Sequence, residues 1–462
     1  MTKTTDATLW IKNPLAIYSN QSNSSSPSNC EGGLVIRGNK IVELVTKNQQ
    51  PITPIDTTFD ASRLVVLPGL INTHHHFYQT LTRAFPTALD KPLFPWLKSL
   101  YPVWAGLRPE QIHWSSRLAL AELLLSGCTT AADHHYLFPQ GLENAVDIQV
   151  DAAKELGIRM TVTRGSMCLG EDEGGLPPRT TIQTEQAIID DSERVIKEFH
   201  DPEAGAMIQI ALAPCSPFSV TPEVMKASAA LAQKHNVHLH THLAETHDET
   251  DFCRERFGLR PLDYLESVGW MNNKTWLAHG IHFDQEEIER LGKDGVGISH
   301  CPSSNMILAS GICQASALED AGSPLGLGVD GSASNDGSNM IQEVRMAFLL
   351  QRLKDGAENV SHLDALRWAT QGSAGCLGRS DVGDIAVGMQ ADLALYNLDE
   401  ARFSGHGDPL AALILCGAHK ADHVMVGGQW RVKDGVIPEL DMDELLHEHK
   451  QSAKQLAQRY FE

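Results

Sequence analysis

Three consecutive histidines, His74 to His76, close an apolar stretch in the segment LPGLINTHHHFYQT. Successive side chains of a strand point to opposite faces, so we expect His74 and His76 to share one face while His75 points away. Two imidazoles directed at one point are typical of a transition-metal site. A polar turn after a buried strand would explain the same residues, so this segment alone leaves both interpretations open.

Further side chains that bind metals stand at the ends of later apolar runs. The run NVHLHTHLAE ends in His242 and Glu245, TWLAHG contains His279, and GVDGSASND contains Asp330. Zn²⁺ accepts nitrogen and oxygen ligands together, so imidazoles and a carboxylate that meet at one place predict a zinc site.

Two of these regions contain more histidines than a single site needs. His238, His240 and His242 alternate onto one face of their strand, and we expect His242, nearest the strand end, to be the ligand. His240 and His238 would then lie deeper and support the ligands. His134 and His135, after an earlier run, are expected either to line the pocket or to belong to a polar loop.

The chain that carries these residues alternates short apolar runs with longer amphipathic stretches. Eight runs are predicted as strands: LVVLPGLIN, TTAAD, RMTVTRGS, MIQIALAPCS, NVHLHTHLAE, TWLAHG, GVGISHCPSSN and PLGLGVDGSA. Helical segments separate them, and one begins with a predicted capping box of Ser361 and Asp364. This order predicts an α/β fold, a closed (β/α)8 barrel of the TIM type with its active site at the C-terminal strand ends. An open doubly wound sheet is the alternative, although no GxGxxG follows the first strand.

Both ends of the sequence consist of short strand-like runs separated by turns. We expect them to pair into a discontinuous β-sandwich made of residues 1–66 and 383–440, beside a barrel of residues 67–382 and a C-terminal helical segment of residues 441–462. In that last segment the spacing of His447 and His449 does not place both rings on one helical face, so we expect both at the solvated surface.

Composition restricts the class of protein. The net charge of -21, from 58 acidic and 37 basic residues, argues against nucleic acid or an anionic membrane as the main partner. Nine scattered cysteines without a CxxC pair indicate ordinary thiols in a reducing compartment. The N-terminal stretch MTKTTDATLWIKNPLAI has no long apolar region and predicts no leader segment. We therefore expect a cytoplasmic protein.

The motifs THHH, THLAE, LAHG and GVDGSASND, with GLPP and APCSP between them, resemble the amidohydrolase superfamily over nearly the whole chain. Within it the sequence is similar to the branch of aminohydrolases that deaminate heterocycles. The resemblance implies one divalent metal per subunit, Zn²⁺ or alternatively Fe²⁺, and a homo-oligomer, most simply a dimer. It implies the metal ligands His74, His76, His242 and Asp330 and the catalytic residues Glu245, His279 and Asp330.

The resemblance also implies a purine base as the substrate, most specifically 8-oxoguanine, which water converts to urate and ammonia. Gln79 matches a glutamine that contacts the purine in members that deaminate guanine, but their strand-four arginine has no counterpart in APCSPFSV, where Cys215 stands. Trp96, Tyr101 and Trp104 are expected either as an aromatic lid or as core. We predict that Gln79, Trp96, Tyr101 and Cys215 contact the substrate.

Four alternatives stay open at this stage. Deamination of guanine, or removal of an amino group from a hydroxyatrazine-type triazine, would use the same catalytic residues with a different pocket. A thiol hydrolase would use Cys215 as its nucleophile, although the metal residues already account for the histidines that such an enzyme needs. A sensor that binds a metal or a purine without turnover would lack the acid and base residues that this sequence contains.

Overall fold

The computed structural model describes residues 7–19 and 30–461. Residues 1–6, the start of the N-terminal stretch that we expect to contain no leader, lie outside the described residues. Eight parallel strands close into a barrel in the order β10-β11-β12-β13-β14-β7-β8-β9, which confirms the (β/α)8 prediction. Their bounds are β7 Leu70–Asn72, β8 Cys128–His135, β9 Arg159–Ser166, β10 Ile208–Pro214, β11 His238–Leu243, β12 Thr275–His279, β13 Gly297–His300 and β14 Leu325–Leu327.

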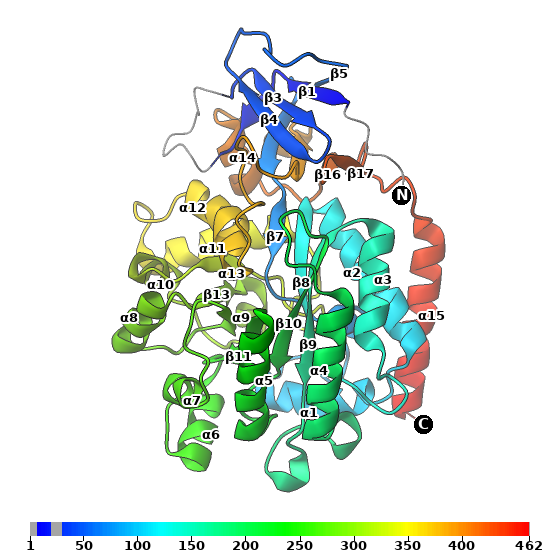
Figure 1. Ribbon diagram of the computed structural model, residues 1–462, viewed down its shortest axis with the longest axis vertical. Coiled ribbons are helices and arrows are strands. Elements are labelled where there is room, and N and C mark those ends of the chain that lie inside the picture. The colour runs from blue at the N-terminus through cyan, green and yellow to red at the C-terminus, as the bar shows by residue number, and fades with distance from the viewer. Residues whose placement is uncertain (1–6, 20–29, 462) are drawn as a thin grey trace.

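Helices surround this barrel (Figure 1). The α-helices are α1 Leu93–Trp104, α2 Pro109–Leu125, α3 Ala145–Leu156, α4 Glu185–Phe199, α5 Pro222–His235, α6 His247–Phe257, α7 Pro261–Ser267, α8 Gln285–Asp294, α9 Pro302–Ile307, α10 Ala315–Ala321, α11 Met340–Asp355, α12 His362–Arg367, α13 Ser373–Cys376 and α14 Pro409–Leu415. The 3-10 helices are η1 Phe77–Thr82, η2 Glu171–Glu173, η3 Arg179–Thr181 and η5 Ala401–Phe403, and η4 Trp368–Gly372 is a π-helix. The predicted capping box at Ser361 and Asp364 begins α12 and is confirmed.

The apolar run LVVLPGLIN, which we expected as one barrel strand, is divided between two sheets. Its first half is β6 (Leu64–Pro68), which pairs with β15 (Leu393–Asn397) outside the barrel, and only β7 belongs to the barrel wall. The division falls at Gly69, where a Cβ atom would lie 2.0 Å from the Thr129 side chain, so the close approach to β8 requires glycine.

Two sheets built from both ends of the chain lie at one end of the barrel (Figure 1). One has the order β4-β3-β1-β5 and the other β17-β16-β15-β6-β2. Their remaining strands are β1 Thr8–Lys12, β2 Ala16–Ile17, β3 Gly33–Arg37, β4 Lys40–Val45, β5 Thr57–Asp60, β16 His423–Val426 and β17 Gln429–Val432. Buried side chains of both sheets, among them Ile11, Leu34, Val66 and Leu393, form one apolar cluster. The predicted barrel boundary at residue 67 falls inside β6 of the second sheet.

The C-terminal helix α15 (Met442–Phe461) runs along the side of the barrel next to α2 (Figure 1). Our expectation for one of its histidines is wrong. His447 is exposed, but His449 is only 8% exposed and its Nε2 lies 3.0 Å from Thr80 Oγ1 in η1. The helical spacing separates the two rings as predicted, but it places one of them against the segment that follows the THHH motif.

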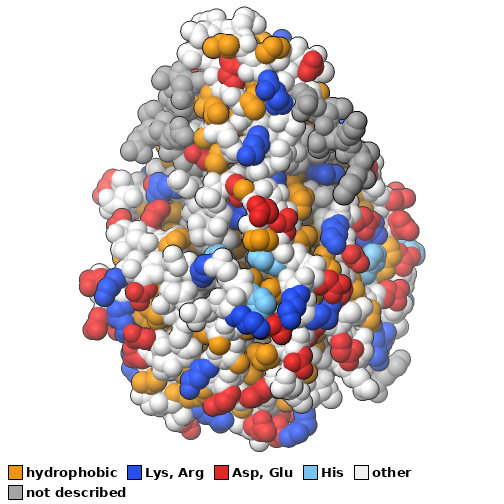
Figure 2. All heavy atoms as spheres, viewed as in Figure 1, with side chains coloured by type: hydrophobic (Ala, Val, Ile, Leu, Met, Phe, Trp, Pro, Cys, Tyr) orange, Lys and Arg blue, Asp and Glu red, His pale blue; other side chains and the backbone are white. Residues whose placement is uncertain are grey.

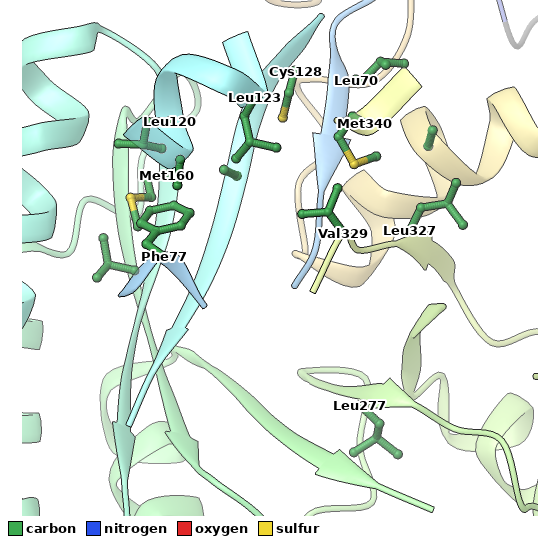
Figure 3. Packing of buried hydrophobic residues seen from close by; sticks show 14 of the residues in the cluster. Leu70, Phe77, Leu120, Leu123, Cys128, Met160, Leu277, Leu327, Val329 and Met340 are labelled. Carbon is green, nitrogen blue, oxygen red and sulfur yellow. The ribbon is translucent and has the colours of Figure 1, made fainter. Parts of the chain in front are cut away.

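The core lies between the barrel wall and the helices. Figure 3 shows Phe77, Leu120 and Met160 packed together, from η1, α2 and β9. All three are at most 1% exposed, and burial of each such side chain contributes about 1.5–3 kcal/mol. Because Phe77 directly follows His76, this packing also anchors the segment that carries the first two histidines.

On the face shown in Figure 2, acidic and basic side chains are interspersed, without a broad basic area. Among the described helices, none combines the length and apolar character needed to cross a bilayer.

Candidate metal and acid–base site

The four predicted metal ligands meet at the C-terminal ends of three barrel strands. His76 Nε2 lies 3.2 Å from His242 Nε2, and Asp330 Oδ1 lies 3.3 Å from the Nε2 atoms of both His74 and His76. Ligand atoms about 2.0 Å from a tetrahedral ion lie roughly 3.3 Å from one another. His74 Nε2 is buried and lacks a hydrogen-bond partner among the described residues. The donor set and its spacing therefore fit a divalent metal such as Zn²⁺.

The other ring nitrogens determine which atoms face this centre. His76 Nδ1 lies 2.7 Å from the carbonyl oxygen of His134, and His242 Nδ1 lies 2.6 Å from that of Cys215. A carbonyl can only accept, so each Nδ1 carries the proton and donates. Both Nε2 atoms are then unprotonated and available as ligands.

His74 acquires the same tautomer through a second histidine. His240 Nδ1 donates to the carbonyl oxygen of Trp276 at 2.9 Å, which leaves His240 Nε2 as an acceptor for His74 Nδ1 at 2.8 Å. Burial lowers the pKa of His74 and His240 well below the usual histidine range and that of His242 to about 3, so these rings are neutral. His240 thus has the position beneath the ligands that its strand register predicts.

Of the remaining histidines in the segments around residues 75 and 135, His75 and His135 bond groups outside the metal centre, and His134 lies among the predicted ligands. His75 points away from the centre, with its Nε2 2.9 Å from Ser338 Oγ, and His135 Nε2 donates to the carbonyl of Leu137. His134 joins the imidazole cluster and stacks on His242 with a centroid distance of 4.7 Å. His134 and His135 are the last two residues of β8, so they belong to the barrel wall and not to a polar loop, and neither is among the residues that line the cavity.

The predicted acid–base residues lie beside the metal ligands. Glu245 Oε2 is 3.4 Å from His279 Nε2, and Ser310 Oγ donates to Glu245 Oε1 at 3.3 Å. Burial raises the pKa of Glu245. Burial alone would lower the pKa of His279, but the charges of Glu245 and Asp330 raise it above the usual value. The Glu245 carboxyl group can therefore accept and release a proton, and the neighbouring His279 imidazole can donate a hydrogen bond.

Asp330 is held ionised in a strained backbone. Its Oδ2 accepts from Ser304 Oγ at 2.6 Å and its Oδ1 accepts from the Gly331 N–H at 2.7 Å. Burial opposes ionisation, but the hydrogen bonds from Ser304 and the Gly331 N–H and the charge of His279 favour the carboxylate form. Asp330 has a φ of 61° and His279 a φ of 73°, left-handed values that cost about 1–3 kcal/mol each in residues other than glycine. Such strain at this place is typical of a functional site.

A cavity lined by aromatic and polar side chains opens onto these groups. All four residues predicted to contact the substrate line it: Gln79, Trp96, Tyr101 and Cys215. Gln79 Oε1 accepts the Ala333 N–H at 3.3 Å, and Trp96 Nε1 donates to the Ala333 carbonyl at 3.2 Å, so the backbone of one residue fixes both side chains. The amide nitrogen of Gln79 is then the group left to face a ligand.

Tyr101, Trp104 and Cys215, which were singled out in the sequence, each have a different environment in the structure. The Tyr101 hydroxyl is buried and has no hydrogen-bond partner among the described residues. Trp104 is fully buried, donates to Thr82 Oγ1 and packs edge-on against the rings of Trp96 and Tyr101, so it belongs to the core behind the cavity. Burial raises the pKa of the Cys215 thiol to about 12, which opposes the thiolate that a nucleophilic cysteine needs.

Several residues of the site were not predicted from the sequence. Tyr136 and Phe218 line the cavity, and Asn305 Oδ1 accepts from His279 Nδ1 at 2.9 Å. Ser304, the partner of Asp330, precedes Asn305 in the polar stretch CPSSN that follows β13. Because that stretch also stands at a strand end, its position was a usable signal.

Known proteins with similar sequences and structures cover almost the whole chain. The model of the amidohydrolase family matches residues 65–431. An 8-oxoguanine deaminase of Pseudomonas aeruginosa is 62% identical over 447 residues, 97% of this chain and 98% of the relative. A hydroxydechloroatrazine ethylaminohydrolase of Pseudomonas sp. (strain ADP) is 37% identical over 89% of this chain and 88% of its own. The crystal structure of an atrazine chlorohydrolase of Arthrobacter aurescens TC1 complexed with zinc has a TM-score of 0.89 at 32% identity, covering 96% of this chain and all of that one.

Proposed function

Because the chain belongs to the amidohydrolase family, we propose that it is a metal-dependent hydrolytic deaminase that converts 8-oxoguanine and water to urate and ammonia. One observation carries the proposal: neutral imidazoles with unprotonated Nε2 atoms lie beside an ionised aspartate and the Glu245–His279 pair at the base of an aromatic cavity. The choice of 8-oxoguanine rests on the relative that is 62% identical and bears that name.

The proposed metal site contains one Zn²⁺ per subunit, held by His74, His76, His242 and Asp330. When bound, such an ion lowers the pKa of a coordinated water to about 7 and so makes hydroxide available at neutral pH. The supporting contacts of the three histidines orient their rings for this role before any metal arrives.

Glu245 is proposed as the group that moves protons. It takes a proton from the attacking water, delivers it to a ring nitrogen of the base and then assists its passage to the exocyclic amine, which leaves as ammonia. The carbon that loses nitrogen gains the water oxygen, so one C–N bond is exchanged for one C–O bond. His279 donates a hydrogen bond to the developing oxygen, and Asp330 orients the attacking water.

The cavity suits a planar base with polar edges. Trp96, Tyr101 and Phe218 provide flat apolar surfaces, while the Gln79 amide nitrogen and the Tyr101 hydroxyl provide hydrogen-bond donors. These donors match carbonyl oxygens and ring nitrogens of an oxidised purine. A hydroxylated triazine offers similar acceptors, and the ethylaminohydrolase relative makes it the second candidate substrate.

We also propose a cytoplasmic homo-oligomer that contains the composite β-sandwich and the barrel as separate domains. The cysteines from Cys128 to Cys416 support the reducing compartment, since they are free thiols and all but Cys416 are buried. The small cavity lined by aromatic side chains supports a free base rather than a nucleic acid as the substrate.

The test is ammonia release from zinc-loaded protein given 8-oxoguanine, guanine, isocytosine and hydroxyatrazine in parallel, with an ultraviolet spectrum of each product. We expect the highest kcat/KM for 8-oxoguanine, with the appearance of urate. Turnover of the triazine alone would refute the purine assignment. Absence of turnover by metal-loaded protein with all four would refute deamination of this substrate class.

A further inference from the structure

Glu245 is placed by a short turn between β11 and α6, at the end of the barrel remote from the two sheets (Figure 1). Ala244, the residue before it, has a φ of 55°, in the left-handed region that a residue with a Cβ atom rarely adopts. A backbone of this kind persists only where its surroundings hold it. The contacts around Ala244 therefore determine where the Glu245 side chain lies.

Three backbone groups of this turn have hydrogen-bond partners. The Ala244 carbonyl accepts the N–H groups of Ile281 and His282, both at 2.9 Å. Its own N–H donates to Glu249 Oε1 at 2.9 Å, and the Glu245 N–H donates to Glu249 Oε2 at 3.2 Å. Since Ile281 and His282 closely follow the last residue of β12, the turn is joined on one side to the segment that carries His279 and on the other to Glu249.

Glu249 is unusual for a residue in the first turn of a helix. It is fully buried, and its carboxylate bonds backbone N–H groups rather than a basic side chain. The glutamate of a capping box bonds the N–H of the N-cap residue, here Thr246, whereas Glu249 reaches one and two residues further back. Burying a carboxylate is unfavourable, and it raises the pKa of Glu249 to about 7. An apolar side chain would fill this place at lower cost, but only a carboxylate accepts both N–H groups at once.

We propose that Glu249 is a positioning residue for the reaction: its two carboxylate oxygens hold the strained turn of Ala244 and Glu245 and so keep the Glu245 carboxyl group beside His279. The role is distinct from catalysis, because the hydrogen bonds of Glu249 go to the backbone and not to the reacting groups. The effect on turnover rests on the proposed deaminase function. The effect on the turn itself does not.

The test is Glu249→Gln in the zinc-loaded protein. Glutamine has nearly the same shape but one acceptor and an NH₂ group, so one of the two N–H groups would face another donor. We expect kcat for 8-oxoguanine to fall by about 10- to 100-fold, as for a misplacement of about 1 Å, with KM changed less than about threefold. The zinc content should stay at the wild-type level.

A matched control is Glu287→Gln. Glu287 is also buried, also stands at the third position of its helix, α8, and also accepts a backbone N–H, that of Asp284. Its carboxylate also accepts from Arg260 at 2.8 and 2.6 Å, and none of these bonds goes to the backbone of Ala244 or Glu245. We expect E287Q to lower the melting temperature while kcat and KM stay near the wild-type values.

Hydrogen exchange measured by mass spectrometry provides a readout that is independent of activity. In E249Q, but not in E287Q, the peptide covering residues 243–247 should exchange faster. Unchanged exchange together with an unchanged kcat would overturn the proposal, and so would a loss of kcat that matches a loss of zinc. Inactive wild-type protein would refute the proposed function and leave the exchange test in force. If E249Q does not fold, Glu249→Asp serves the same test, because its shorter side chain cannot reach both N–H groups.

Discussion

Replacing His240 by phenylalanine tests whether the second histidine sets the tautomer of His74. The ring of His240 stacks on Trp276 with a centroid distance of 4.3 Å and an interplanar angle of 14°. Phenylalanine can keep this stacking but cannot accept a hydrogen bond. H240F therefore removes the 2.8 Å contact with His74 Nδ1 and preserves most of the packing.

The magnitude follows from burial. Both rings are at most 1% exposed, so the Nδ1–H of His74 would lose its acceptor without gaining water. An unsatisfied buried donor costs about 1–3 kcal/mol. Without metal, His74 can instead carry its proton on Nε2, toward Asp330, so the penalty falls on the metal-bound form; at 1.4 kcal/mol for each factor of ten, metal affinity should fall by about 5- to 140-fold. This range agrees with the roughly 10- to 100-fold loss that usually follows removal of a residue that orients a metal ligand.

The assay is competition for Zn²⁺ between the protein and a chromogenic chelator. His238→Phe is the matched control, because His238 lies two residues earlier on the same strand, whereas the hydrogen bond of His74 Nδ1 goes to His240. H238F should bind zinc as the wild type does. An affinity of H240F within about twofold of the wild-type value would refute the tautomer argument, as would an equal loss in H238F.

Three further predictions concern the acid–base group, the cavity and the pH dependence of stability. Glu245→Gln should lower kcat by about 10²–10⁴-fold and keep zinc bound, whereas His242→Ala should lose zinc. Metal content and turnover are measured for both variants. If the two variants do not differ, the assignment of Glu245 as acid–base group and of His242 as metal ligand is wrong. Tyr101→Phe removes a buried hydroxyl without a partner among the described residues, so it should raise the free energy of unfolding by about 1 kcal/mol while raising KM. Denaturant unfolding measures the first effect. Destabilisation of the variant would contradict the interpretation of the Tyr101 hydroxyl as a group that waits for a ligand. Burial raises the pKa of Glu343 from 4.5 to about 7, so its protonated form favours the folded state and its contribution is lost as the pH rises from about 4.5 to 7. The stability of the wild type relative to Glu343→Gln should therefore fall over that range by up to about 3 kcal/mol, and a difference independent of pH would exclude the raised pKa.

Much of the site was predictable because it depends on local periodicity. The alternation of a strand is enough to separate His74 and His76 from His75, and the observed directions agree with it. Parallel strands of a barrel place their C-terminal ends at one mouth, so residues at the ends of distant runs could be grouped before any coordinates were known. The histidine at 242 and the aspartate at 330 were found in this way.

Other features depend on contacts that no local pattern encodes. The apolar run at residues 64–72 has the composition of one strand, and its division follows from the contact of Gly69 with Thr129, 60 positions along the chain. His449 appeared to be a surface residue because its helix is polar overall, yet it lies against Thr80, 369 residues away in sequence.

The sequence by itself determined which residue types stand at the strand ends, and with them the barrel, the candidate ligands and the candidate acid and base. Only the tertiary structure decided which nitrogen of each ring is unprotonated and how the catalytic turn is held. The physical reason is that these properties depend on hydrogen-bond partners brought together by folding. His74 and His240 are 166 residues apart, and the carbonyl of Ala244 meets N–H groups that follow the next strand.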